Sequence, residues 1–127
     1  MNIKLVREGN DQRHFAFSAA HLRAEIMCGA TIPDQSSVHP REVDPYAFRE
    51  FLRVHCTFPG YSVFEGAGYW EGKREITRVI VVYGPNNVAF AAEVRKIADA
   101  YRDTFNQDAV AFGFVPAGFG LTDPKGV

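Results

Sequence analysis

The chain has 127 residues, a formal net charge of −1, 46% hydrophobic residues and 23% charged residues. These values are typical of a globular domain, and a chain of this length can bury a core without disulfides or metal ions. The balanced charge argues against binding to a DNA or RNA polymer or to an anionic membrane, and the sequence has no run of about 18 apolar residues that could span one.

The first predicted elements are an extension, a strand and a loop. Residues 1–20 show a weak alternation of apolar residues, which allows short edge strands in an N-terminal extension. Residues 21–30 carry apolar side chains at every second position and more polar ones between them, which predicts a strand with one buried face. Residues 31–43 hold two prolines, two serines and two acids, and predict a loop.

A helix is predicted after this loop. Asp44 followed by Pro45 is the N-cap and first residue typical of a helix start. Phe48, Phe51 and Leu52 share one face at helical spacing. We expect the helix to run to about residue 55 and to end before a Pro-Gly pair.

A β-hairpin is predicted next, with strands at 61–70 and 75–83 and a turn at 71–74. The second strand is rich in β-branched residues and is expected to be central and buried. Gly66 and Gly68 in the first strand predict a bulge, a bend or a close backbone approach.

The last elements are a helix and a strand. Asn87 ends a Gly-Pro-Asn-Asn turn and is the predicted cap of a helix that reaches about residue 105. Residues 109–115 alternate large and small side chains and predict a strand. The tail at 116–127 is rich in glycine and proline and is expected to be irregular.

From residue 21 the predicted order is strand, helix, strand, strand, helix, strand. Short connections and right-handed crossovers arrange these elements as a ferredoxin-like split β-α-β fold of the α+β class, with a four-stranded antiparallel sheet and two helices on one face. We find no repeat and no linker, so we expect one domain over residues 1–127, with an extension at 1–20, a core at 21–115 and a tail at 116–127.

One face of such a sheet has no helix over it. We expect this face to carry Met27, Tyr61 or Phe64, Trp70 and aromatic residues of the last strand. A bare apolar sheet face usually becomes buried in an oligomer, so the pattern predicts a homo-oligomer, as a dimer, trimer or hexamer.

The cysteines and histidines predict neither a disulfide nor a metal site. Cys28 and Cys56 are far apart, and residues 1–9 are too polar for a secretory signal, so we expect free thiols in a cytoplasmic protein. The four histidines lack the spacing of metal ligands. We therefore expect no metal ion and no cofactor.

Five stretches form an ordered pattern along the chain. They are 22–26 (LRAEI) with Gly29, 48–60 (ending in Phe-Pro-Gly), 66–70 (GAGYW), 74–77 (REIT) leading into 79–82, and 100–110 (AYRDTFNQDAV). Together they resemble a widespread family of small domains of unknown function, over residues 22–121. The resemblance implies a fold and brings no established activity.

The order of the elements resembles that of the PII and CutA signalling proteins, which are ferredoxin-like trimers that bind nucleotides between subunits. The small size, the expected oligomer and the lack of catalytic motifs are also compatible with phage proteins that act as sponges for nucleotide immune signals of bacteria. Both resemblances imply a nucleotide ligand, and the first places it at a subunit boundary.

The hairpin carries the densest patch of polar and aromatic side chains. Its aromatic rings offer stacking surfaces for a base, its arginines offer planar forks for phosphate, and its glutamate can accept from a base edge or a ribose hydroxyl. The alternative is that Trp70 packs in a subunit interface while the charged residues form cross-strand ion pairs. The candidate ligand-binding residues are Tyr69, Trp70, Arg74, Glu75, Arg78 and Arg102.

We therefore expect a non-catalytic homo-oligomer that binds a small anionic ligand, in particular a nucleotide signal, with a phage anti-defence sponge as the specific version. One alternative is a small enzyme that uses Glu65, Glu75 or a histidine as acid or base, although no known catalytic motif is present. The other alternative is a protein-interaction module.

Overall fold

The computed structural model describes residues 20–33, 41–118, 120, 122–123 and 125, so the edge strands considered for residues 1–19 lie outside this part of the chain. The helices and strands expected from the sequence all form close to their expected limits. The elements are β1 (His21–Gly29), β2 (Thr31–Ile32), β3 (Arg41–Glu42), α1 (Pro45–His55), β4 (Ser62–Trp70), β5 (Lys73–Pro85), α2 (Val88–Thr104) and β6 (Ala111–Pro116).

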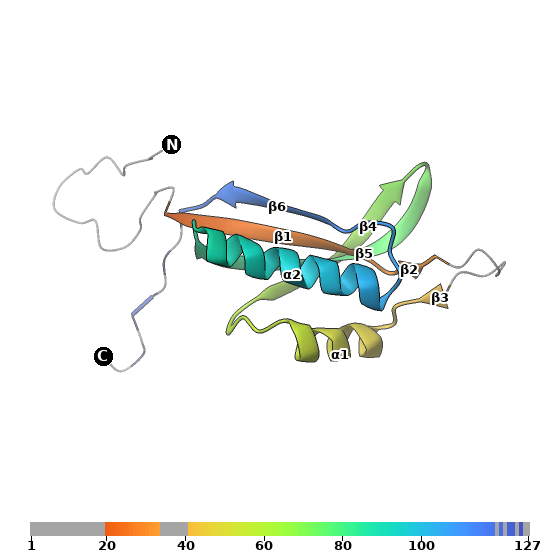
Figure 1. Cartoon of the computed structure of the whole chain (residues 1–127), viewed down its shortest axis with the longest axis horizontal. Helices are drawn as coiled ribbons and strands as arrows, with labels where there is room; N and C mark the ends of the chain where they lie inside the picture. Colours follow the sequence, from red (N-terminus) through yellow and green to blue (C-terminus); the bar gives the residue numbers. More distant parts are fainter. Residues whose placement is uncertain (1–19, 34–40, 119, 121, 124, 126–127) are drawn as a thin grey trace.

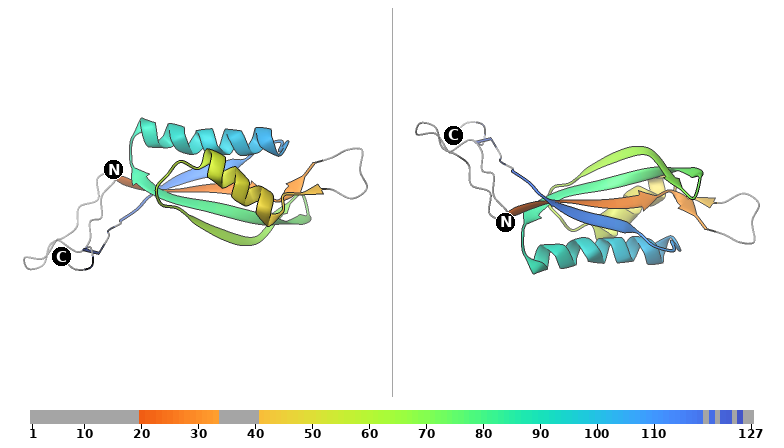
Figure 2. Two further views of the ribbon diagram at one scale, coloured as in Figure 1. Left: turned by 90° about the horizontal axis from the view of Figure 1, so that it is seen from below. Right: turned by 90° about the horizontal axis from the view of Figure 1, so that it is seen from above.

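Four strands form one sheet in the order β4-β5-β1-β6, with every neighbouring pair antiparallel. Both helices lie on the same side of this sheet, as the views in Figure 1 and Figure 2 show. The α+β class and the ferredoxin-like arrangement expected from the sequence are therefore confirmed.

The two helices begin where the sequence predicted. Asp44 caps α1, because its side chain accepts a hydrogen bond of 2.7 Å from the backbone N–H of Ala47. Asn87 caps α2 in the same way, with a 2.8 Å bond from the N–H of Phe90. Each cap satisfies a backbone donor that the first helical turn leaves open. Neither α1 nor α2 has the length and hydropathy of a membrane-spanning helix.

The core lies between the helices and the inner face of the sheet. Its largest fully buried side chain is Tyr101 of α2, whose ring contacts Phe51 of α1 edge-on at 5.2 Å between centroids. From the sheet, alternate residues of the two central strands point into the same layer. These are Ala24, Ile26 and Cys28 of β1, and Ile80 and Val82 of β5.

The segment expected as a loop at 31–43 contains a small ladder. β2 and β3 pair through Thr31↔Glu42 and Ile32↔Arg41, and this ladder continues β1 beyond the main sheet. Strands of two residues show no periodic pattern, so they could not be predicted from the sequence.

The aromatic residues of β6 correct an expectation. We expected them on the bare face, but Phe112 and Phe114 pair with Ile26 and Ala24, whose side chains point into the core. Directly paired residues share a face, so both rings lie on the helix side. Phe114 accordingly packs edge-on against Phe90 of α2, with 6.3 Å between ring centroids.

We call the uncovered side of the main sheet the open face. By the strand register it carries Met27, Phe64, Trp70, Tyr83 and Val115, all of which are exposed. Tyr61, the alternative to Phe64, precedes β4. The far end of the β4–β5 hairpin bends away from the helices (Figure 1), so this end of the open face is concave.

Candidate functional site

The register of the hairpin distributes the expected site residues over both faces of the sheet. Glu65 pairs with Arg78 and Tyr69 with Arg74, on the helix side. Glu75 pairs with Gly68 on the open face. Glu65 and Glu75 therefore point to opposite sides, so the pair of carboxylates considered for acid–base catalysis does not converge.

Arg78 is buried beneath α1 and is bound within the chain. Its guanidinium donates to the backbone oxygen of Val43 at 2.6 Å and lies 5.3 Å from the ring centre of Phe48. Its Nε lies 3.7 Å from a carboxylate oxygen of Glu65, which is the cross-strand ion pair that the sequence offered as the alternative. With 6% of its surface exposed, Arg78 presents no face to a solvent ligand.

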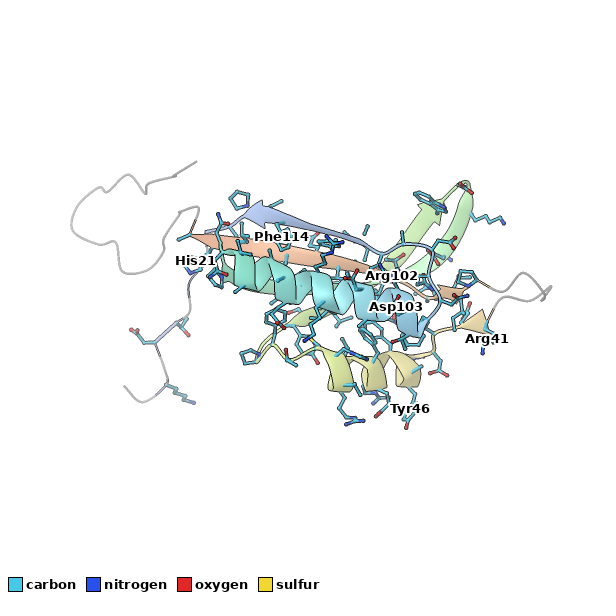
Figure 3. All side chains as sticks on the ribbon, viewed as in Figure 1. His21, Arg41, Tyr46, Arg102, Asp103 and Phe114 are labelled. Carbon is cyan, nitrogen blue, oxygen red and sulfur yellow. The ribbon has the colours of Figure 1, made fainter. Side chains whose placement is uncertain are left out.

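Arg102 is paired as well. It lies near the end of α2 (Figure 3) and contacts Asp99 at 3.2 Å and Asp103 at 2.9 Å. The hydrogen bond from Arg102 lowers the pKa of the Asp103 carboxyl. Two carboxylates therefore balance this guanidinium, which leaves little positive charge for a ligand.

Tyr69, Trp70 and Arg74 lie at the end of the hairpin and are exposed. The aromatic side chains expose 71% and 74% of their surface. The turn between the strands is shorter than expected, because only Glu71 and Gly72 connect them, both with positive φ. Trp70 faces the open side, whereas Tyr69 and Arg74 face the helix side.

Glu75 is half-buried on the open face, and its carboxylate is held by the backbone at the end of β1. One carboxylate oxygen accepts a hydrogen bond of 3.3 Å from the N–H of Thr31. The other lies directly over Gly29, only 2.7 Å from where a Cβ would be. Gly29 therefore has to be glycine for Glu75 to take this position.

The sheet around Glu75 has few side chains on its open side. Gly66 pairs with Thr77 and Gly68 with Glu75, so the part of β4 that faces them is bare. At Gly68 the Thr77 hydroxyl occupies the space that a Cβ would need. Of the outcomes predicted for the two glycines, a close approach is the one found at Gly68, and the ladder runs through both without a bulge. We call this surface, formed by Gly29, Gly66, Gly68, Glu75 and Thr77, the Glu75 site.

Two residues of the α2 end support the site from beneath. Tyr101 donates from its hydroxyl to the backbone oxygen of Gly29 at 2.6 Å, and Gln107 donates to that of Thr31 at 2.9 Å. Gly29, Gly68, Glu75, Tyr101 and Gln107 come from four of the five stretches that carry the family resemblance, and they meet at this one place.

Apart from the Glu75 site, a depression lies on the open face between β1 and β6. It has a volume of about 280 Å³, and its floor is formed by the small residues Ala111 and Gly113. Arg23 and Glu25 line it and form an ion pair at 3.1 Å. In the described residues, no three histidine, cysteine, aspartate or glutamate side chains are grouped as metal ligands.

The fold and the Glu75 site define a small ferredoxin-like protein with one uncovered sheet face. The model of the family described as "Protein of unknown function (DUF3574)" matches residues 23–117. The chain therefore belongs to this family, which confirms the resemblance seen in the sequence. No curated protein matches the chain. The likeness to PII and CutA proteins stays a prediction.

Among solved structures, the chain is similar in fold to a phage SAM lyase in complex with S-methyl-5'-thioadenosine. The two chains are 15% identical and superpose with a TM-score of 0.57, over 82% of this chain and 91% of the other. At this identity the likeness concerns the fold.

Proposed function

We propose that the protein binds a small adenosine-type nucleoside or nucleotide at the Glu75 site, as a homo-oligomer and without converting the ligand. This keeps the ligand class expected from the sequence but moves the centre of the site from the arginines to Glu75. The reason is that Arg78 and Arg102 are bound within the chain. The site therefore offers acceptors for hydroxyl and amino groups more than a cradle for phosphate.

One observation carries the proposal, namely the bare backbone beside a fixed carboxylate. A purine or ribose ring needs an unobstructed surface, and Gly66, over which no atom lies within 4 Å of an added Cβ, leaves one on β4. The Glu75 carboxylate can accept from ribose hydroxyls, and the exposed Trp70 on the same face offers a stacking ring. The phage SAM lyase supports the proposal, because that protein holds a ligand of this class on the same fold.

The first prediction uses Gly66, where an added Cβ would meet no atom within 4 Å. Gly66→Val should therefore fold and yet fill the bare surface. We expect S-methyl-5'-thioadenosine to bind about tenfold more weakly or worse, a loss of at least about 1.4 kcal/mol, when measured by titration calorimetry. Ala67→Val is the matched control, since it places the same side chain on the helix side of β4. Equal binding by both variants would place the ligand elsewhere.

The sponge version of the proposal is tested by the fate of the ligand. The protein is incubated with a panel of cyclic and linear nucleotides, freed of unbound ligand and denatured by heat, and the released compounds are analysed. A sponge returns its nucleotide intact. If no nucleotide is released, and calorimetry detects no binding of the panel or of S-methyl-5'-thioadenosine, the proposed binding function is wrong.

The fold shared with a lyase favours one alternative, an enzyme that acts on S-adenosylmethionine with Glu75 as acid or base. Incubation with S-adenosylmethionine, followed by chromatography and mass spectrometry, distinguishes the two. Formation of S-methyl-5'-thioadenosine that Glu75→Gln abolishes would establish the enzyme and overturn the non-catalytic part of the proposal. Recovery of unchanged S-adenosylmethionine would support a binding protein.

A second copy of the chain is the partner we propose for the open face. Charge complementarity favours this partner, because the face carries both signs: Lys73 is positive and Glu75 negative, beside the internal ion pair of Arg23 and Glu25. The charges of such a face can be matched by those of a second copy. A nucleic acid or an acidic peptide instead needs a surface that carries only positive charge. The exposed apolar side chains of the open face give this contact its area.

A further inference from the structure

The last residues of β1 extend beyond the point at which its pairing with β6 ends. β6 pairs with β1 only as far as Met27, whereas β5 follows β1 to Gly29, and the N–H of Ala30 still donates to Ile76 at 2.8 Å. In an antiparallel strand the backbone groups of alternate residues point to the same edge. The carbonyls of Gly29 and Thr31 are therefore directed to an edge where β6 has not yet begun.

Two side chains of the α2 end take the place of the missing strand. The hydroxyl of Tyr101 donates to the Gly29 oxygen at 2.6 Å, and the amide of Gln107 donates to the Thr31 oxygen at 2.9 Å and to the Phe105 oxygen at 3.2 Å. Tyr101 is fully buried, and burial raises the pKa of its phenol. The hydroxyl therefore stays protonated and remains a donor.

The same stretch of backbone holds Glu75. The N–H of Thr31 binds one oxygen of its carboxylate, and the missing side chain of Gly29 leaves room for the other. A shift of this backbone would move the Thr31 donor and close or open the space over Gly29. The position of Glu75 thus depends on two side chains that bind the backbone of Gly29 and Thr31 and do not contact Glu75 themselves in hydrogen bonds.

We propose that Tyr101 and Gln107 are positioning residues for the Glu75 site. This inference rests on the proposed function, since it assumes that Glu75 contacts the ligand. Side chains that stand in for a strand fix the backbone at two points while leaving the open face above it bare. A paired strand at this place would bring its own side chains to the open face and cover the site.

The test measures binding of S-methyl-5'-thioadenosine by Tyr101→Phe, which removes one oxygen and keeps the ring in the core. We expect binding about tenfold weaker than that of the unmodified chain. Gln107→Met is the second variant, for the case that Tyr101→Phe does not fold. Asn87→Ala is the matched control, because it removes a cap from the other end of the same helix and leaves Gly29 and Thr31 in place. The folded Asn87→Ala variant should bind S-methyl-5'-thioadenosine as tightly as the unmodified chain does.

A double-mutant cycle shows whether Tyr101 acts through Glu75. If it does, Tyr101→Phe adds little to the loss already caused by Glu75→Gln; if it only stabilises the fold, the two losses add. Additive losses, or a loss in Asn87→Ala equal to that in Tyr101→Phe, would overturn the inference.

Hydrogen exchange of the Thr31 amide separates this inference from the proposed function. The amide should exchange faster in Tyr101→Phe than in Asn87→Ala at matched global stability, whether or not a nucleoside binds. Absence of binding by the unmodified chain would defeat the proposed function alone. Unchanged exchange at Thr31 would defeat the positioning role.

Discussion

Arg78 is a buried arginine that contacts both the segment before α1 and the helix itself. In the sequence it belongs to a run of charged residues and is a plausible phosphate ligand. In the fold it lies on the inner side of β5, where it joins α1 to the sheet through Val43 and Phe48. The strand register decides this, because alternate residues of a strand point to opposite faces.

Arg78→Ala should therefore destabilise the fold. It leaves the buried Val43 oxygen without its charged donor and opens a cavity under Phe48, so we expect the free energy of unfolding to fall by about 2–4 kcal/mol. Urea denaturation followed by circular dichroism measures this. Arg53→Ala is the control, since Arg53 is exposed and forms a surface ion pair with Glu50, and the loss in free energy of unfolding should stay below about 0.5 kcal/mol. Similar losses in both variants would contradict the structural role of Arg78.

Glu75 and Trp70 could be chosen from the sequence, but their surroundings could not. Gly29 is 46 positions before Glu75 in the sequence, and only the fold brings it beneath the carboxylate. The ring of Tyr101 lies among the buried residues of α2, at the helical spacing of a core-facing stripe. The hydroxyl of Tyr101 also donates a hydrogen bond to the Gly29 oxygen. The spacing of residues along the helix does not predict this bond, because it depends on how α2 crosses the sheet.

At the scale of elements, the two helices were predicted well because their start signals are local. Asp44 and Asn87 bind backbone donors only three residues ahead, so four consecutive residues contain the whole signal. The β2–β3 ladder was missed because its pairing joins residues about ten positions apart and depends on Val43 donating to Ala30.

Asp44→Ala tests the cap of α1. The N–H of Ala47 loses its partner, so we expect the free energy of unfolding to drop by about 1 kcal/mol. Asp44→Asn keeps an acceptor oxygen at the same place and should restore most of the loss. Thermal unfolding followed by circular dichroism compares the three proteins. If Asn and Ala are equally destabilising, the cap is not what stabilises this helix.

For the hairpin, the sequence left open whether its glycines form a bulge. The question matters because one extra residue in β4 would reverse its faces and place Glu65 beside Glu75. The continuous ladder from Ser62 to Trp70 settles the faces and separates the two carboxylates. A local pattern could not decide this, because bulges depend on how the partner strand packs.

At the scale of the whole molecule, the open face is the side of the main sheet that neither α1 nor α2 covers. Val115 on β6 is 52% exposed on the open face, at the depression between β1 and β6. Val54 is 56% exposed on α1. The two valines are matched in type and exposure and differ in the surface that they occupy.

If a second copy covers the open face, Val115→Asp should reduce the solution mass to that of one chain, while Val54→Asp should leave the oligomer intact. A charge buried without a partner in an interface costs several kcal/mol, which is enough to separate the copies. Light scattering coupled to size-exclusion chromatography gives the masses, and circular dichroism confirms folding. A single-chain mass for the unmodified protein would refute the proposal, as would equal behaviour of the two variants.

The sequence by itself determined the order of the elements, the helix limits and the ferredoxin-like class, because capping, periodicity and turn chemistry act over a few neighbouring residues. Only the tertiary structure decided which charged residues are free to meet a ligand. That choice depends on strand register and on contacts such as Glu75 with Thr31 or Tyr101 with Gly29, which join residues 44 and 72 positions apart. Contacts of that range form only when the sheet and its helices pack together, and no local pattern encodes them.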